Sequence, residues 1–372
     1  MTKGRKGLGI GMRCWIDLPL IVLGTALTIA AESGIAATSA HTPGPSSKPS
    51  DASASLISPA LDSNLGIVRS LLQQPEDQID LARAKLAIDR LVDPSVDVNG
   101  SMAIIEAMAA TENRLIPLGT SVFTKMQTLR QYLYEVGPWN NNMVFHYDFD
   151  DPKGNKLENK LLSHYLATRK GQCVSMPILF LAVAQRMGMD VALALAPNHS
   201  FVMLRGDDGQ WLNLETTGTG APTKIETYQR QFPMSPASLE QGAYMRPLMK
   251  KEAVASMVEE LLQQYDEQHR YEQEIALADL ALRYHPKNVG ILLFRSYAYE
   301  EIVRRDFIAF YPTAKDIPTN LRPRYKAFAT EAVASRKQAI ALGALPVNAQ
   351  REASYQDNID RAKAEMSKGA TP

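Results

Sequence analysis

The sequence has few cysteines, no excess of either charge and no long apolar run, and each absence excludes a class of protein. Two cysteines among 372 residues exclude a disulfide framework and a four-cysteine zinc site. Lys plus Arg and Asp plus Glu both number 40, so no basic field favours nucleic-acid binding. The apolar run Leu18–Ala31 is shorter than the roughly 20 residues that span a bilayer. The composition, 45% hydrophobic and 22% charged, instead indicates soluble globular folding, with a length that suits two domains.

Sequence motifs for cofactors and metals are also missing. The chain has no phosphate-binding loop of the Walker type and no dinucleotide-binding glycine motif after a predicted strand. His146 and His164 have no partner at metal-ligand spacing. The acidic run at residues 148–151 resembles the start of a calcium loop, but Lys153 replaces the required glycine and Asn159 the bidentate acid. The sequence therefore predicts neither an organic cofactor nor a bound metal.

The first 40 residues have the order of an export signal. Basic side chains precede Leu18–Ala31, and small residues follow it. We expect the basic residues to stay inside and the remainder to be delivered outside the cytoplasm, to the periplasm or an equivalent compartment. Residues 1–40 are thus predicted to be a cleaved signal or an uncleaved anchor, the only expected contact with a membrane. Residues 41–63, rich in Pro, Ser, Ala and Thr, are predicted to be a linker.

Residues 64–240 combine helical and strand patterns. Apolar residues at helical spacing predict three lead-in helices, at residues 79–92, 102–113 and 122–136. A strongly apolar helix at residues 175–187 follows, with Ser175 as the predicted N-cap and Gly188 as its end. Three strand-like segments come next, at residues 190–196, 199–204 and 211–214, and the last two flank a hairpin turn. This part of the chain is predicted to be an α+β domain with a helix packed on an antiparallel sheet.

Residues 241–368 are predicted to form an all-α domain. Between Val258 and Pro286 the apolar residues have a spacing similar to a tetratricopeptide repeat. Glu274 stands where that repeat needs a small residue, and a second unit from Val289 is interrupted at residues 310–324. A tetratricopeptide-like stack and a plain helical bundle therefore both remain open.

Three residues of the α+β domain have the types needed for nucleophilic catalysis by a thiol. Cys173 lies at the start of the apolar helix, where free N–H groups and the helix dipole favour a thiolate. His199 opens one strand and Glu215 ends the next. If the hairpin is centred on Asp207, His199 and Glu215 lie directly opposite each other, so that the carboxylate holds one imidazole nitrogen while the other faces the thiol. Taken singly, each of these residues has an ordinary structural explanation.

The order and spacing of these residues resemble the transglutaminase-like cysteine superfamily, whose core is papain-like. The resemblance is strongest in Gly171-Gln172-Cys173, Pro197-Asn198-His199 and the segment 211–215. Further segments resemble the bacterial SirB-type branch, in which a transglutaminase-like core precedes tetratricopeptide-like helices; they are residues 81–94, 139–142, 169–171 and 186–189. The resemblance covers about residues 66–350. Glu215 departs from the superfamily's usual aspartate, and many SirB-type members lack the cysteine that this chain retains.

The resemblance implies acyl transfer through a thioester. Cys173 would attack an amide or peptide carbonyl, His199 would move the proton, and Glu215 would fix the imidazole tautomer. The oxyanion would bind the N–H of Cys173 and a second donor, for which Gln172 and Asn142 are candidates by residue type. Hydrolysis by an amidase or peptidase and cross-linking to an amine both remain open.

The alternative function is a non-catalytic module. In that case the same fold and the helical domain bind a peptide or protein, such as a component of the cell envelope. A reactive Cys173 distinguishes the thiol enzyme from the binding module, in which this thiol is buried and inert.

Overall fold

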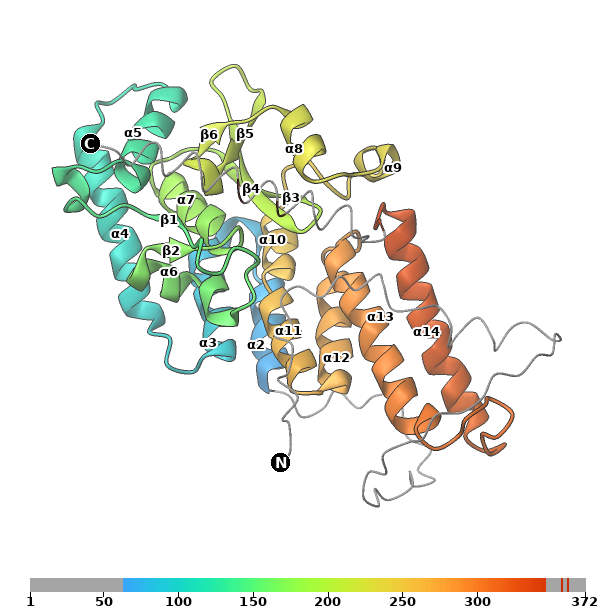
Figure 1. Ribbon diagram of the computed structural model, residues 1–372. Helices are drawn as coiled ribbons and strands as arrows, with labels where there is room; N and C mark the ends of the chain where they lie inside the picture. The colour runs from blue at the N-terminus through green and yellow to red at the C-terminus, as the bar shows by residue number, and fades with distance from the viewer. Residues whose placement is uncertain (1–62, 346–355, 357–359, 361–372) are drawn as a thin grey trace.

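The computed structural model describes residues 63–345 together with Gln356 and Asp360. Apart from Ser63, the predicted export signal and linker lie outside the described residues, as does most of the chain after residue 345. Helices lead in, an antiparallel sheet follows, and helices close the chain (Figure 1). Among the described residues, no helix combines the length and the apolar character needed to cross a membrane.

Of the five lead-in helices in the described part of the chain, three begin at a capping side chain. The five are α2 (Ser63–Gln73), α3 (Leu81–Val92), α4 (Val98–Leu115), α5 (Val122–Tyr134) and α6 (Leu162–Thr168), with 3-10 turns at Glu76–Gln78, Pro138–Asn140 and Leu157–Lys160. Asp80, Asp97 and Ser121 accept hydrogen bonds from first-turn N–H groups of α3, α4 and α5. The three predicted helices are therefore confirmed in position, and α4 begins four residues earlier than predicted.

The sheet has the predicted antiparallel character. Its strands are β3 (Val191–Ala196), β4 (His199–Arg205), β5 (Trp211–Glu215) and β6 (Ala221–Pro222), hydrogen-bonded in that order. The apolar helix α7 (Ser175–Arg186) packs on β3 and β4 and ends at Gly188, whose φ is +70°. A short parallel pair, β1 (His146–Tyr147) with β2 (Lys170–Gly171), lies beside it.

The predicted N-cap of α7 is wrong. Val174 is the N-cap, with no side-chain cap bond, and Ser175 is already the first helical residue. The Ser175 Oγ accepts a hydrogen bond from the N–H of Gln172 at 3.1 Å, so it holds the preceding turn instead of the helix end.

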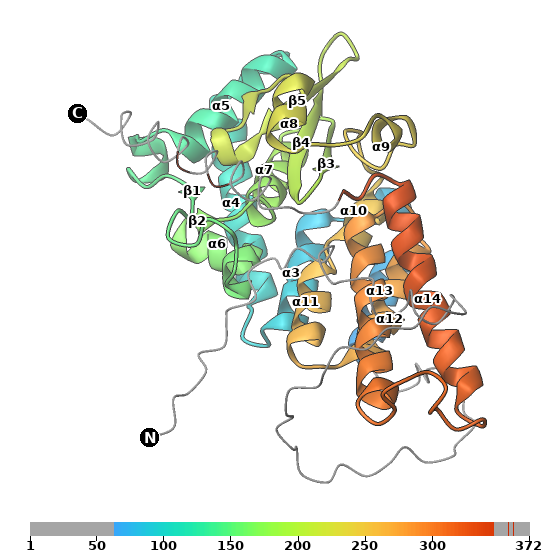
Figure 2. The same ribbon diagram turned by 45° about the vertical axis from the view of Figure 1, so that its right-hand side comes forward.

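Helices dominate the rest of the described chain, as predicted from residue 241 on, and the two helices before that residue were not predicted. The helices are α8 (Ile225–Gln231), α9 (Pro236–Glu240), α10 (Lys250–Ser256), α11 (Glu259–Glu267), α12 (Tyr271–Leu282), α13 (Val289–Val303) and α14 (Arg322–Ala341), with a π-helical segment at Arg304–Ile308. Helices α12, α13 and α14 lie side by side (Figures 1 and 2). The break between α13 and α14 lies at the predicted interruption.

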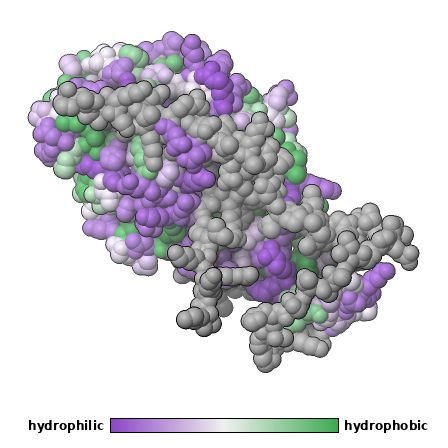
Figure 3. All heavy atoms as spheres, in the orientation of Figure 1, coloured by the Kyte–Doolittle hydropathy of each residue, from purple (hydrophilic) through white to green (hydrophobic). Residues whose placement is uncertain are grey.

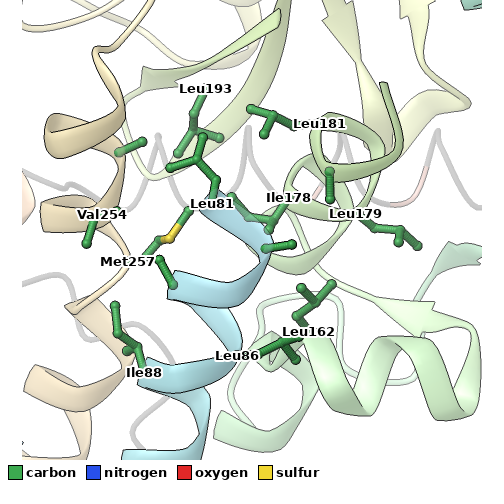
Figure 4. Packing of buried hydrophobic residues seen from close by; sticks show 14 of the residues in the cluster. Leu81, Leu86, Ile88, Leu162, Ile178, Leu179, Leu181, Leu193, Val254 and Met257 are labelled. Carbon is green, nitrogen blue, oxygen red and sulfur yellow. The ribbon is translucent and has the colours of Figure 1, made fainter. Parts of the chain in front are cut away.

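One core joins the lead-in helices, α7 and the first carboxy-terminal helices. A continuous buried cluster runs from Leu65 to Ile291. Figure 4 shows α3 in its centre, with Leu81 between Met257 on one side and Ile178 on the other. The domain boundary predicted near residue 240 thus crosses a shared apolar core.

A buried charged group also links these parts. The Lys85 Nζ of α3 lies 2.7 Å from the Asp89 Oδ1 and 3.0 Å from the Glu260 Oε2 of α11, and all three side chains are buried. Asp89 accepts a second hydrogen bond from the N–H of Leu162 at 2.7 Å. On the outside, hydrophilic and hydrophobic residues are mixed over the face shown in Figure 3.

Candidate active site

Cys173 lies in the turn that enters helix α7 and is half-buried. Among the described residues, no acceptor takes a hydrogen bond from the N–H of Cys173 or of Val174. These two groups stand at the positive end of the α7 dipole, beside the thiol. The turn therefore offers two free donors and a field that favours a negative charge.

A tight turn brings His199 to this thiol. Pro197 and Asn198 join β3 to β4, and Asn198 has a φ of +57°, as the third position of a type II turn requires. The Ser200 hydroxyl donates to the carbonyl of Cys173, which fastens the first residues of β4 to the cysteine loop. His199 and Cys173 line the same cavity, and the Cys173 side chain is near enough to the imidazole to raise the pKa of His199.

The other side of the imidazole is held by Glu215. His199 Nε2 and Glu215 Oε2 are 2.7 Å apart, which leaves Nδ1 for the thiol side. The second carboxylate oxygen accepts from the N–H of Thr217 at 3.0 Å and from its hydroxyl at 2.6 Å. Both oxygens of the Glu215 carboxylate are thus held by hydrogen bonds.

The pairing of β4 with β5 is shifted from the predicted register, so His199 and Glu215 are diagonal neighbours instead of direct partners. The last pair of β4 and β5 is Arg205 with Trp211. The five residues between them are centred on Asp208 and not on the predicted Asp207. Val202 pairs with Leu214, so Glu215 lies across from Phe201 and diagonal to His199, on the same face. Diagonal neighbours are about 7–8 Å apart instead of about 5 Å. The extra methylene of glutamate, compared with aspartate, spans this longer distance.

The charges of His199 and Glu215 stabilise each other. Burial lowers the pKa of His199, but the Glu215 carboxylate and the hydrogen bond with Cys173 outweigh it and raise this pKa to about 10. Burial raises the pKa of Glu215, and the bonds from His199 and Thr217 overcome this and hold it below its usual value. The imidazole is therefore protonated at neutral pH, next to a thiol.

Aromatic rings complete the pocket around the imidazole. The Phe232 ring stacks on His199 with centroids 4.3 Å apart and an angle of 11° between planes. Tyr228, fully buried, lies at a centroid distance of 6.1 Å. The sequence analysis missed both residues, because α8 and the turn after it carry no motif that points to the histidine.

Cys173 and His199 open into a cavity of about 200 Å³. Its first wall comes from the cysteine turn, α7, β3 and β4. Its opposite wall comes from α10, α11 and the start of α13, including Glu259, Gln263 and Asn288. Sequence reasoning did not find this second wall, because nothing local in these helices marks them as neighbours of the cysteine.

The two oxyanion candidates are not placed alike. Gln172 lines the cavity, but its Nε2 donates to the carbonyls of Asp148 (3.3 Å) and Asp151 (2.7 Å), so both amide hydrogens hold the loop. Asn142 lies exposed between α5 and β1 and is not among the cavity-lining residues. Neither side chain is thus free to meet an oxyanion at Cys173, whereas the N–H of Val174 is.

The carboxylates of the acidic loop before the site accept hydrogen bonds from other groups of the protein. Asp151 accepts from the N–H groups of Asn155 and Lys156, and the Asn159 amide donates to Asp148 and Asp151 at 3.0 Å each. In the part of the chain that the structure describes, no group of three or more His, Cys, Asp or Glu residues is arranged to hold a metal ion.

Comparison with known proteins gives a family match and a distant relative. A family model described as "Transglutaminase-like superfamily" matches residues 101–271, from α4 to the start of α12, and includes Cys173, His199 and Glu215. Residues 101–271 are a transglutaminase-like superfamily domain. The chain is also 21% identical over 272 residues to a "UPF0162 protein" of Xylella fastidiosa (strain 9a5c), an alignment covering 68% of this chain and 92% of that relative. The family match extends past residue 240, so α10 and α11, with Glu259 and Gln263, fall within the transglutaminase-like domain.

Proposed function

We propose that the protein is an exported thiol enzyme that transfers or hydrolyses acyl groups at amide bonds. The observation that carries this proposal is the chain of contacts at the cavity: Cys173 at the α7 N-terminus, His199 beside it, and Glu215 at 2.7 Å from the far imidazole nitrogen. Nucleophile, proton carrier and orienting carboxylate are the parts that acyl transfer requires.

The proposed reaction begins with the Cys173 thiolate and the His199 imidazolium. Sγ attacks the amide carbonyl carbon, and His199 gives its proton to the leaving nitrogen as the C–N bond breaks. A thioester remains on Cys173. Water or an amine then attacks the thioester, His199 takes a proton from that nucleophile, and the product acid or new amide leaves. Glu215 keeps Nε2 protonated and pointed away from the thiol throughout.

The oxyanion of each tetrahedral intermediate would be bound by backbone groups. The free N–H groups of Cys173 and Val174 lie at the positive end of α7, and donors fixed there stabilise developing negative charge. Val174 therefore replaces Gln172 and Asn142 as the proposed second donor.

The wider assignment is also part of the proposal. The cysteine and histidine motifs favour the SirB-type branch, and the consecutive helices α11–α14 suit a tetratricopeptide-like tail that binds a peptide or protein. The signal-like residues 1–40 favour action outside the cytoplasm, on cell-envelope material.

One observation favours a second function, a non-catalytic binding module. Helices α10, α11 and α13 close one side of the cavity and supply much of its polar lining. Such a two-sided cavity is also typical of a pocket that only binds a ligand.

An acyl-transfer assay on the full-length protein separates these functions. With a glutamine-containing peptide and hydroxylamine as acceptor, the enzyme yields a hydroxamate, and with water alone it yields ammonia. Both products should depend on Cys173 and disappear in Cys173→Ser. Binding of the peptide without either product, unchanged in Cys173→Ser, would instead establish the binding module.

A further inference from the structure

The wall of the cavity opposite Cys173 carries two charges of opposite sign that do not pair. Glu259, at the start of α11, and Lys160, before α6, are both half-buried and line the cavity. The Lys160 ammonium is near enough to lower the pKa of Glu259, yet no ion pair joins the two side chains. Glu259 and Lys160 therefore each face the cavity and can form an ion pair with a ligand.

Side-chain amides hold both charges in place. Asn288 donates to the Glu259 Oε1 at 3.1 Å, and Lys160 Nζ donates to the Gln263 Oε1 at 2.7 Å. Among the described residues, no donor bonds to the Glu259 Oε2. Burial and the neighbouring Glu260 raise the pKa of Glu259 to about 7, as expected for a carboxylate that lacks a cationic partner.

A glycine fixes the position of the carboxylate. A Cβ at Gly290, in the first turn of α13, would lie 3.0 Å from the Glu259 Oε1 and 3.2 Å from its Cδ. A side chain at this position would force the carboxylate to shift by a few tenths of an ångström. The residues named around Glu259 come from three separate parts of the chain.

Glu260 and His199, two other charged groups near the cavity, pair with residues other than Glu259 and Lys160. Glu260 is used by Lys85 at 3.0 Å, and His199 is used by Glu215 at 2.7 Å. Lys153, a second ammonium, also lines the cavity. A ligand that satisfies the wall therefore needs a positive group for Glu259 and a negative group for the lysine side.

We propose that this wall is a subsite for the zwitterionic end of an amino acid, with its ammonium at Glu259 and its carboxylate at Lys160. The inference rests on the proposed function, and it assigns the substrate class: a small amide whose acyl or amine part ends in a free α-amino acid. The volume of about 200 Å³ agrees, because it is below the range of about 300–1,000 Å³ that drug-sized ligands occupy and suits an end group.

Four symmetrical disulfides that react with Cys173 test this assignment in the full-length protein. Bis(2-hydroxyethyl) disulfide is neutral, cystamine is cationic, 3,3′-dithiodipropionate is anionic and cystine is zwitterionic. Each rate of mixed-disulfide formation is read by mass on the peptide that carries Cys173. It is then divided by the rate of the same reagent with N-acetylcysteine amide, which removes differences in leaving group.

Cystine should react about tenfold faster than the neutral disulfide, because it alone forms charge-assisted hydrogen bonds with both charges. Glu259→Gln and Lys160→Met should each reduce this preference to about twofold or less, and Glu259→Gln should also speed the anionic reagent. Gly290→Ala, which shifts the carboxylate but keeps its charge, should reduce the preference less than Glu259→Gln does. The exposed Glu240→Gln and Lys326→Met are the matched controls and should change nothing.

The inference is overturned if cystine has no preference over the neutral disulfide, or if the preference survives both Glu259→Gln and Lys160→Met. An unchanged rate of the neutral disulfide in these variants shows that the fold and the thiol are intact. The proposed function is tested separately by the neutral disulfide alone. If its rate does not depend on His199, the catalytic assignment fails whatever the charge preference.

Discussion

At the scale of single residues, the length of Glu215 is matched to the strand register. The diagonal placement of Glu215 and His199 is bridged by the longer side chain at 2.7 Å, and Thr217 holds the carboxylate from behind. An aspartate at this position would start from the same Cα with one methylene less. Residue type and register therefore explain together why this chain departs from the usual aspartate.

Glu215→Asp should consequently impair the site although it preserves the charge. We expect the rate of iodoacetamide alkylation of Cys173 at pH 7 to fall about tenfold, as loss of about 1.4 kcal/mol of imidazolium stabilisation implies. The alkylation rate of Glu215→Gln should fall at least as far. Mass spectrometry of the Cys173 peptide gives the rates, and a parental rate in Glu215→Asp would show that the contact is not needed.

Gly171 should be required for packing at the entrance to the site. A Cβ there would lie 2.5 Å from the buried ring of Tyr165 and 2.8 Å from the Ser175 Oγ. Gly171→Ala should destabilise the protein by about 1–3 kcal/mol through overpacking. Gly66→Ala is the matched control, since no atom lies within 4 Å of its added Cβ in helix α2, and it should stabilise by up to about 1 kcal/mol. Urea unfolding measures both, and equal effects would refute the packing argument.

The sequence could indicate Cys173, His199 and Glu215 because each stands at a predictable end of a helix or strand. It could not indicate Phe232 or Glu259, which reach the site only through tertiary packing. Ser175 was predicted as a cap because its residue type suits that role, but a competing bond from Gln172 determines its orientation.

At the scale of the elements, helix α12 carries an unusual buried acid. Glu274 is fully buried, and both of its carboxylate oxygens lack a hydrogen-bond partner among the described residues. Burial, together with Asp266 and Glu301, raises the pKa of Glu274 well above its usual value. Helix α12 therefore folds with this side chain in its neutral form.

The pH dependence of stability follows from this. A raised pKa in the folded state means that folding takes up a proton, so stability falls as pH rises above about 4.5. Glu274→Gln removes this dependence and should stabilise the protein more at pH 7 than at pH 4. Urea unfolding at the two pH values tests it, and an equal effect at both would show that Glu274 is ionised in the folded state.

Helix positions were largely predictable, since apolar spacing and caps are local properties. The strands were found for the same reason. The exact register of β4 with β5 could not be predicted. The two possible centres of the Gly206–Gly209 turn differ by one residue, and this changes the partner of every β4 residue by two positions.

At the scale of the whole molecule, the two predicted domains share one core and one buried charge cluster. Lys85 in α3 bonds to Glu260 in α11, far along the chain. Sequence patterns could suggest two domains from the change of periodicity, but they do not reveal contacts between distant helices. The cavity between the cysteine turn and α11 was missed for the same reason.

Lys85→Met should therefore destabilise the whole molecule. It leaves the buried carboxylates of Asp89 and Glu260 without their cation, a loss worth about 3–5 kcal/mol. The unfolding around Trp139 and Trp211, followed by Trp fluorescence, and of the helices, followed by circular dichroism, should shift together as one transition. Separate shifts would mean that the two parts unfold independently. The exposed Lys326→Met serves as control.

In the proposed mechanism His199 makes the Cys173 thiol a nucleophile. The most direct measurement is the second-order rate of iodoacetamide alkylation of Cys173 at pH 7 in the full-length protein and in His199→Ala, read on the Cys173 peptide. Because the imidazolium favours the thiolate, we predict a rate at least about tenfold higher in the parent. Equal rates, or labelling of Cys173 only after denaturation, would contradict the account.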